Sequence, residues 1–200
     1  MMRTLKILLF LFISCLCFGC QSSLRRESRI EKQDDVYVLS FANLSFSVSA
    51  GKGGRIVSFK CEDRELLTSD SVHSKYYGAT FWLSPQSEYW PQYQCVDELP
   101  YQAEIDKQIL RLVSPPDSIS GVSVTKEFSI SERDSSILIH YSVRNVSRQL
   151  KRLAPWDVTR VYGGLSFFPV GETDQMNKSD VTGGYEDKGM VWVPCPDGTN

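Results

Sequence analysis

One segment, 81–93, combines large aromatic rings with amide, hydroxyl and carboxylate groups. It reads FWLSPQSEYWPQY, so the rings are interleaved with Gln86 and Glu88 between two prolines. Flat apolar faces beside fixed hydrogen-bonding groups suit a neutral sugar, whose C–H faces stack on rings while its hydroxyls need partners. The segment therefore predicts a carbohydrate-type site, with Trp90 as a stacking plane and Gln86 as an amide that both donates and accepts.

A second segment, 153–161, reads LAPWDVTRV and follows an alternating strand pattern. If it is extended, Trp156 and Arg160 share one face while Asp157 lies on the other. Arg160 can fork onto a carboxylate or onto vicinal hydroxyls, and Trp156 can supply a stacking plane on the same side. The alternative is an ion pair from Arg160 to Glu88 or Asp157 that closes the sheet, with Trp156 in the core.

Candidates for acid–base chemistry are few. Proton transfer needs positioned groups whose pKa values lie near the working pH. Glu88 and Asp157 are the candidate catalytic carboxylates, whereas His140 fits a surface strand position and His73 lies in a polar stretch. With only two histidines and no CxxC motif beyond the signal segment, the sequence predicts no zinc site and no cofactor.

Strand periodicity dominates the chain, and no segment has a sustained helical period. Gly51, Gly53 and Gly54 indicate a hairpin turn that needs positive φ angles. The alternating runs lie at 36–41, 44–49, 55–60, 109–113, 122–130 and 137–146. Short strands joined by polar turns favour an all-β, antiparallel sandwich over an α/β fold.

The N-terminus carries the pattern of an export signal. Two basic residues precede an apolar run, 7–18, that is too short for a membrane-spanning helix. The run ends at Gly19 and Cys20, which resemble the lipobox of bacterial lipoproteins, although Cys17 stands where leucine is usual. Cleavage there would leave Cys20 as a lipidated N-terminus, which predicts a lipid-anchored, extracytoplasmic protein of the bacterial cell envelope. Ordinary secretion with cleavage nearby is the alternative.

The sequence accordingly predicts three parts. Residues 1–20 form a lipoprotein-type signal peptide, 21–35 a flexible polar tether, and 36–200 a single domain. The formal net charge is −2 and the basic residues are scattered, so no nucleic-acid partner is expected, and the domain is expected to be a monomer. Three cysteines remain beyond the lipobox region, and an odd number excludes complete internal pairing.

Four blocks of sequence resemble, in their order, an uncharacterised family of secreted bacterial proteins. That family is related to galactose mutarotase, in the aldose 1-epimerase superfamily. The resemblance covers 36–200. The blocks are GGRI at 53–56, YGATFWLSPQ at 77–86, APWDVTR at 154–160 and GGLSFFP at 163–169.

This resemblance implies a large antiparallel β-supersandwich that binds a sugar in a concave sheet face. It also implies a carboxylate base and a histidine acid, which open the pyranose ring in mutarotases. The base of the superfamily lies near the end of a longer chain, whereas this one stops at 194–200, before the last strands of a full supersandwich. A C-terminally truncated supersandwich is therefore expected, and Asp157 stands where family members often carry glutamate.

Three functions are compatible with these observations. The favoured one is a cell-envelope lipoprotein that binds a neutral saccharide without turnover. Its predicted ligand-binding residues are Gln86, Trp90, Trp156 and Arg160. The first alternative is an aldose 1-epimerase-like isomerase in which Glu88, Asp157 or a histidine transfers protons. The second is a structural envelope domain whose aromatic loop docks another protein.

Overall fold

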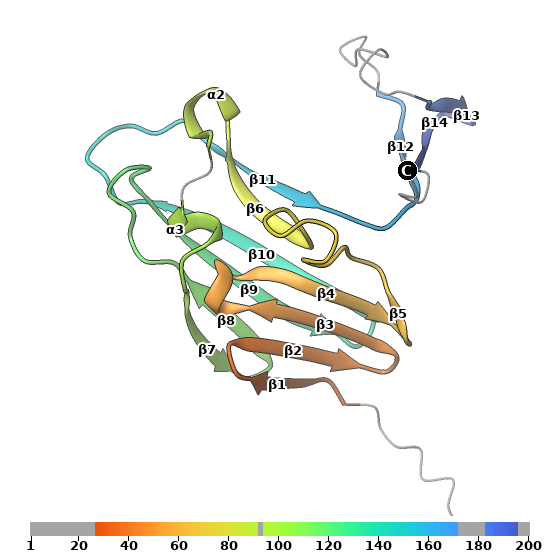
Figure 1. Ribbon diagram of the computed structural model, residues 1–200, viewed down its shortest axis with the longest axis horizontal. Helices are drawn as coiled ribbons and strands as arrows, with labels where there is room; N and C mark the ends of the chain where they lie inside the picture. Colours follow the sequence, from red (N-terminus) through yellow and green to blue (C-terminus); the bar gives the residue numbers. More distant parts are fainter. Residues whose placement is uncertain (1–26, 92–93, 172–182, 196–200) are drawn as a thin grey trace, which may run out of the picture.

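The computed structural model describes residues 27–91, 94–171 and 183–195 of the chain. Antiparallel strands in three sheets make up most of it, and two of the sheets pack face to face (Figure 1). The predicted all-β sandwich is therefore confirmed. No helix in these ranges is long and apolar enough to cross a membrane.

The largest sheet has the order β1-β2-β3-β4-β6-β11, with β5 paired to β4. Its strands are β1 (Arg29–Gln33), β2 (Val36–Phe41), β3 (Leu44–Ser49), β4 (Arg55–Cys61), β5 (Arg64–Glu65), β6 (Ala79–Ser84) and β11 (Ala154–Thr159). Three short helices flank this sheet: η1 (Ala50–Lys52), α2 (Gln86–Tyr89) and α3 (Gln94–Asp97). Consecutive strands β1 to β4 form a meander, whereas β11 returns from far along the sequence to pair with β6.

The second sheet has the order β10-β9-β8-β7 and lies behind the first in Figure 1. Its strands are β7 (Gln102–Asp106), β8 (Ile109–Val113), β9 (Val122–Ser131) and β10 (Ser136–Asn145). A third, small sheet contains β12 (Gly164–Pro169), β13 (Tyr185–Asp187) and β14 (Met190–Cys195). Figure 1 shows this third sheet standing away from the sandwich.

The core lies between the first two sheets because alternate residues of their strands point inward. Val124 and Phe128 of β9 are fully buried, and the Phe128 ring lies 5.8 Å from that of Phe46 on β3. Phe81 of β6 packs in the same way, 4.7 Å from the ring of Tyr141 on β10. Each such side chain contributes about 1.5–3 kcal/mol when it is fully buried.

The strand predictions at 36–41, 44–49 and 109–113 coincide with β2, β3 and β8. The predicted tether over 21–35 is wrong for Arg29–Gln33, which pairs with β2 along its whole length. These residues are mostly polar and lack a clear alternation; Ile30 packs against the core, and backbone pairing with β2 holds the rest of this edge strand. The predicted signal peptide, including Cys20, lies outside the described residues.

The turn between β3 and β4 is pressed against α3. Gly53 and Gly54 have φ angles of 64° and 62°, as their positions predict, whereas Gly51 is not among the residues with positive φ. A Cβ on Gly53 would lie 2.2 Å from the carbonyl carbon of Asp97, and the Gly53 N–H donates to the Leu99 carbonyl at 3.1 Å. Only glycine allows this close approach of two backbone segments.

Substitution of Gly53 by alanine should therefore lower the free energy of unfolding by more than the strain of a positive φ alone explains. Gly189 is a matched control, since its φ is 75° but nothing lies within 4 Å of a Cβ placed there. We expect Gly189→Ala to lower the free energy of unfolding by about 1–2 kcal/mol from backbone strain. Gly53→Ala should lower it by about 2 kcal/mol more, because Asp97 must move. Urea denaturation measures both, and equal losses would contradict the close approach.

Candidate functional site

The pairing of β6 with β11 places two indole rings side by side. Phe81 and Leu83 point into the core, so Trp82 points to the outer face of the sheet. The register sets Trp82 opposite Trp156, with ring centroids 5.3 Å apart and an interplanar angle of 78°. Trp82 is only 6% exposed, although it lies on the outer face of the sheet.

The chain after α2 brings a third indole to the same place. Trp90 lies 5.3 Å from Trp82, at an angle of 69°, and is 44% exposed. Tyr76, on the loop before β6, meets Trp82 edge-on at 6.0 Å. The two segments singled out in the sequence therefore meet at a buried tryptophan. The Trp82 cluster denotes Tyr76, Trp82, Trp90, Trp156 and Arg160.

Arg160 completes this cluster from the end of β11. Its guanidinium carbon lies 5.3 Å from the Trp82 ring centre and 5.6 Å from that of Tyr76. Its Nη1 donates to the Thr80 hydroxyl at 3.1 Å and to the Val158 carbonyl at 3.2 Å. Burial lowers the pKa of Arg160 from its ordinary value, although nearby carboxylates oppose this shift. Stacking on rings replaces a carboxylate partner here.

The alternative of an ion pair from Arg160 to Glu88 or Asp157 is wrong, since Arg160 forms neither pair in the described structure. Asp157 lies on the opposite face of β11, as the alternation predicts. It accepts hydrogen bonds from the Tyr141 hydroxyl at 2.9 Å and from Thr159 at 3.0 Å. Burial, with Asp157 nearby, raises the pKa of Tyr141 well above its usual range.

Gln86 and Glu88 lie on α2, and both are exposed. Within the described part of the chain, neither side chain has a hydrogen-bond partner. Of the predicted ligand-binding residues, the structure thus brings together Trp90, Trp156 and Arg160 around Trp82, whereas Gln86 forms no hydrogen bond with them in the described structure. The two candidate catalytic carboxylates, Glu88 and Asp157, are also separate from one another, one on α2 and one on the inner face of β11.

The buried carboxylate of Asp97 joins the Trp82 cluster to the interior. Its Oδ2 accepts from the Trp82 Nε1 at 3.2 Å and from the Arg55 Nη2 at 2.9 Å. Arg55 is 4% exposed and Asp97 is wholly buried, and the guanidinium also covers the Tyr77 ring at 4.9 Å. Desolvation raises the pKa of Asp97, while the charges of Arg55 and Lys126 oppose that rise.

Lys126 is a second charge that the sequence analysis missed. It is 1% exposed, and its Nζ donates to the Gly53 carbonyl at 2.6 Å. The ammonium lies 5.2 Å from the ring centres of both Phe81 and Tyr101. Burial lowers the pKa of Lys126 to about 8. A signal was present, because Lys126 occupies an inward position of β9 between Val124 and Phe128.

The two histidines have different settings. The Nδ1 of His73 accepts the backbone N–H of Tyr76 at 2.9 Å, and its ring lies 5.0 Å from the Tyr76 ring. His73 therefore shapes the loop that carries Tyr76 to the cluster. His140 is exposed on β10 beside Ser142, in agreement with a surface strand position. Across residues 27–91, 94–171 and 183–195, no group of His, Cys, Asp and Glu side chains could hold a metal ion.

Comparison with known proteins gives no match: no family model, no curated protein and no solved structure resembles this chain significantly. The similarity to the mutarotase-related family therefore stays a prediction from the four sequence blocks.

Loss of Asp97 should destabilise the fold strongly. Asp97→Ala leaves the Arg55 guanidinium buried without its carboxylate, which costs about 3–5 kcal/mol. Glu98→Ala is the matched control, since Glu98 pairs with Lys75 at 3.4 Å near the surface and such pairs contribute about 0–1 kcal/mol. Chemical denaturation should separate the two variants clearly. Similar losses from both would show that the buried pair does not hold this region together.

Lys126 should give stability a measurable pH dependence. The unfolded chain keeps the ordinary pKa of 10.5, so between about pH 8 and 10.5 it binds a proton that the folded chain has released. The contribution of Lys126 to stability is therefore least favourable below pH 8 and improves as pH rises through this window. Relative to Lys126→Met, the wild-type protein should gain about 2 kcal/mol between pH 7.5 and 9.5.

Other groups act against this trend, because burial raises the pKa of Cys95 to about 12 and that of Tyr101 well above its usual value. Both groups are present in each protein, so the difference between the two stability profiles isolates Lys126. Lys60→Met, at an exposed position of β4, is the control and should follow the wild-type profile. Parallel profiles for wild type and Lys126→Met would contradict the lowered pKa.

Proposed function

We propose that this protein binds a saccharide at the Trp82 cluster, as the carbohydrate-binding domain of a cell-envelope lipoprotein. The observation that carries the proposal is the meeting of Trp90, Trp156 and Arg160 around the buried ring of Trp82. The cell-envelope address rests on the signal pattern of residues 1–20.

The chemistry of the cluster supports a sugar as its ligand. Trp90 exposes 44% of its surface although it packs on another indole, so part of its ring is open to a stacking partner. A sugar ring presents C–H groups that pack on such a surface. In the described structure only the Nη1 of Arg160 donates hydrogen bonds, which leaves further guanidinium N–H groups for vicinal hydroxyls.

The arrangement favours binding over turnover. An isomerase needs a base and an acid on opposite sides of one sugar ring. Asp157 lies on the other face of β11 from Trp156, and both of its oxygens already accept hydrogen bonds. Glu88 is exposed on α2 and lies apart from Asp157. We therefore infer recognition without a proton-transfer step.

Removal of the exposed indole should weaken saccharide binding without unfolding the domain. Calorimetry with a panel of neutral mono- and oligosaccharides should give saturable binding to the wild-type protein. Trp90→Ala should lose about tenfold in affinity, equivalent to about 1.4 kcal/mol. Phe167→Ala is the control, since Phe167 is 60% exposed on β12, outside the cluster, and its loss should leave affinity unchanged.

Absence of binding to every saccharide would refute the proposed function, as would equal affinity for wild type and Trp90→Ala. The rate of anomer exchange, followed by polarimetry, should match that of buffer. A faster rate that Glu88→Gln abolishes would instead favour the isomerase.

A further inference from the structure

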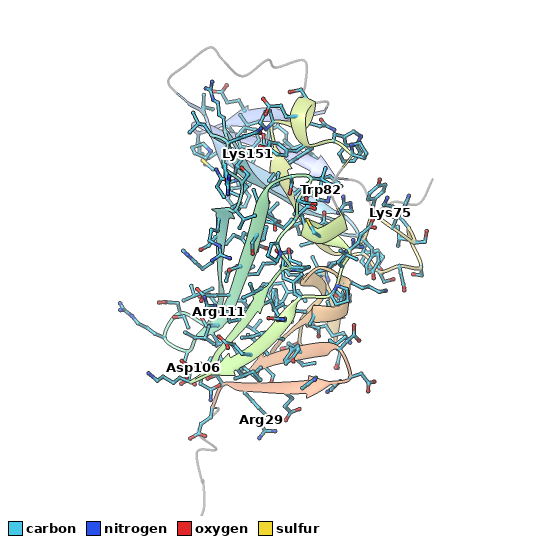
Figure 2. All side chains as sticks on the ribbon, turned by 90° about the vertical axis from the view of Figure 1, so that its left-hand side faces the viewer. Arg29, Lys75, Trp82, Asp106, Arg111 and Lys151 are labelled. Carbon is cyan, nitrogen blue, oxygen red and sulfur yellow. The ribbon has the colours of Figure 1, made fainter. Side chains whose placement is uncertain are left out.

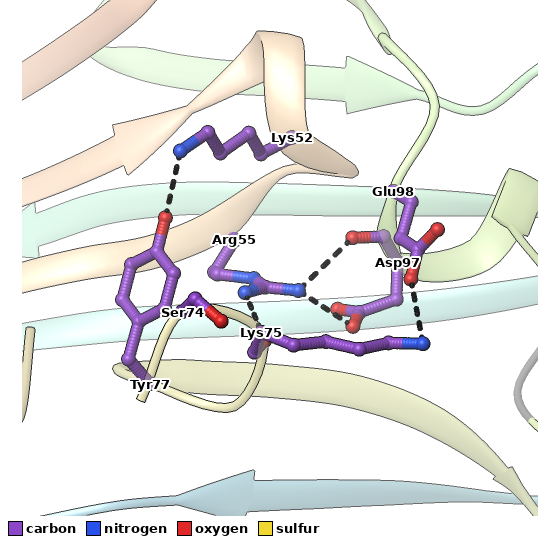
Figure 3. A pocket seen from close by; sticks show the side chains of 7 residues that line it. All are labelled: Lys52, Arg55, Ser74, Lys75, Tyr77, Asp97 and Glu98. Carbon is purple, nitrogen blue, oxygen red and sulfur yellow. Dashed lines mark hydrogen bonds and ion pairs between the residues drawn. The ribbon is translucent and has the colours of Figure 1, made fainter. Parts of the chain in front are cut away.

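A pocket of about 190 Å³ is lined in part by Asp97, which also binds the Trp82 indole (Figure 3 shows the pocket). It is smaller than the roughly 300–1,000 Å³ of sites that enclose a drug-sized ligand, so it suits one substituent or a single ring. We call it the Lys52 pocket. Its lining residues are Lys52 of η1, Arg55 of β4, Ser74, Lys75 and Tyr77 of the loop before β6, and Asp97 and Glu98 at the end of α3.

The charges in the Lys52 pocket do not cancel. Arg55 pairs with Asp97 at 2.9 Å, and Lys75 pairs with Glu98 at 3.4 Å. Lys52 has no carboxylate within ion-pair distance in the described structure; it donates to the Tyr77 hydroxyl at 2.9 Å, and Asp70 acts on it only through space. Figure 3 shows this ammonium over the Tyr77 hydroxyl, with Arg55 lying between Tyr77 and Asp97. The pocket therefore carries one uncompensated positive charge.

Two polar atoms in the pocket wall are buried without a hydrogen-bond partner. They are the Nε of Arg55 and the Oδ1 of Asp97, on side chains that are 5% and 0% exposed. Buried polar atoms nearly always have a partner, so an unpaired donor and an unpaired acceptor in one pocket wall leave unused hydrogen-bonding capacity for a further polar group. A hydroxyl, which donates and accepts at once, matches this pair.

The pocket and the Trp82 cluster share a wall. The same Asp97 oxygen that binds Arg55 also accepts from the Trp82 indole. Tyr76 belongs to the cluster, whereas the adjacent Tyr77 lines the pocket. Figure 2 shows Trp82 and Lys75 in the same part of the molecule, and Lys75 directly precedes Tyr76 on the loop before β6. One ligand can therefore contact both places if it carries a charged group beside its ring.

We propose that the Lys52 pocket binds a monoanionic substituent of the saccharide, either the carboxylate of a uronic acid or a sulfate ester. A single negative charge matches the one uncompensated ammonium, whereas a phosphate monoester would carry a charge of about −1.5 to −2. A hydroxyl beside the substituent reaches toward Arg55 and Asp97. The inference rests on the proposed function, because the sugar ring itself occupies the Trp82 cluster.

The test compares glucose, glucuronic acid, glucose 6-sulfate and sodium acetate by calorimetry on the full chain. Wild type should bind an acidic sugar about tenfold more tightly than glucose, the size of one charge-assisted hydrogen bond. High salt should reduce this preference. Lys52→Met, which keeps the stem and removes the charge, should abolish the preference and leave glucose binding unchanged. Lys60→Met, which removes an exposed charge elsewhere on β4, should change neither affinity.

The outcomes separate this inference from the proposed function. Equal affinity for glucose and both acidic sugars, or a preference that survives Lys52→Met, overturns the inference and leaves the proposed function standing. If the affinity for an acidic sugar depends on Lys52 but is unchanged in Trp90→Ala, the result supports the pocket and overturns the role of the cluster. If acetate binds as tightly as glucuronic acid, the pocket does not recognise a saccharide and the inference is overturned. If no sugar binds, both the inference and the proposed function are overturned. Preference for glucuronic acid or for the sulfate ester identifies the anion.

Discussion

The structure around the candidate site depends on one buried carboxylate. Asp97 holds the guanidinium of Arg55 and the indole of Trp82 through the same oxygen, and so connects α3 to β4 and β6. A charge in this position is tolerated only because it is paired and hydrogen-bonded. The turn at Gly53 lies directly against the backbone of Asp97, so the β3–β4 connection is positioned by the same contact.

Strand β6 serves both the fold and the site because its two faces differ in surroundings. Phe81 and Leu83 fill the core between the sheets, whereas Trp82 forms the base of an aromatic cluster on the outer face. Strand β11 adds Trp156 opposite Trp82. Recognition groups that stand on a strand buried on both faces are held more rigidly than groups on a free loop.

The strands could be predicted from local alternation of apolar and polar residues, because every second residue of a strand faces the core. The edge strand Arg29–Gln33 could not be predicted in this way, because Ile30 is its one core-packed side chain and the backbone hydrogen bonds to β2 leave no side-chain pattern. In the site, Trp90 and Trp156 were predicted because their sequence segments combine aromatic rings with polar side chains. Gln86 was chosen on the same grounds, yet α2 leaves it exposed and without a hydrogen bond to the cluster in the described structure.

By itself the sequence determined the all-β class and the side of β11 on which Trp156 and Arg160 lie, because both follow from residue alternation along one strand. Only the tertiary structure decided that Trp82 joins the two aromatic segments and that Asp97 binds Arg55. These contacts join residues far apart in the chain, through pairing and register that no local pattern encodes. The uncompensated charge of Lys52 likewise emerged only when its neighbours, and their partners, were placed in space.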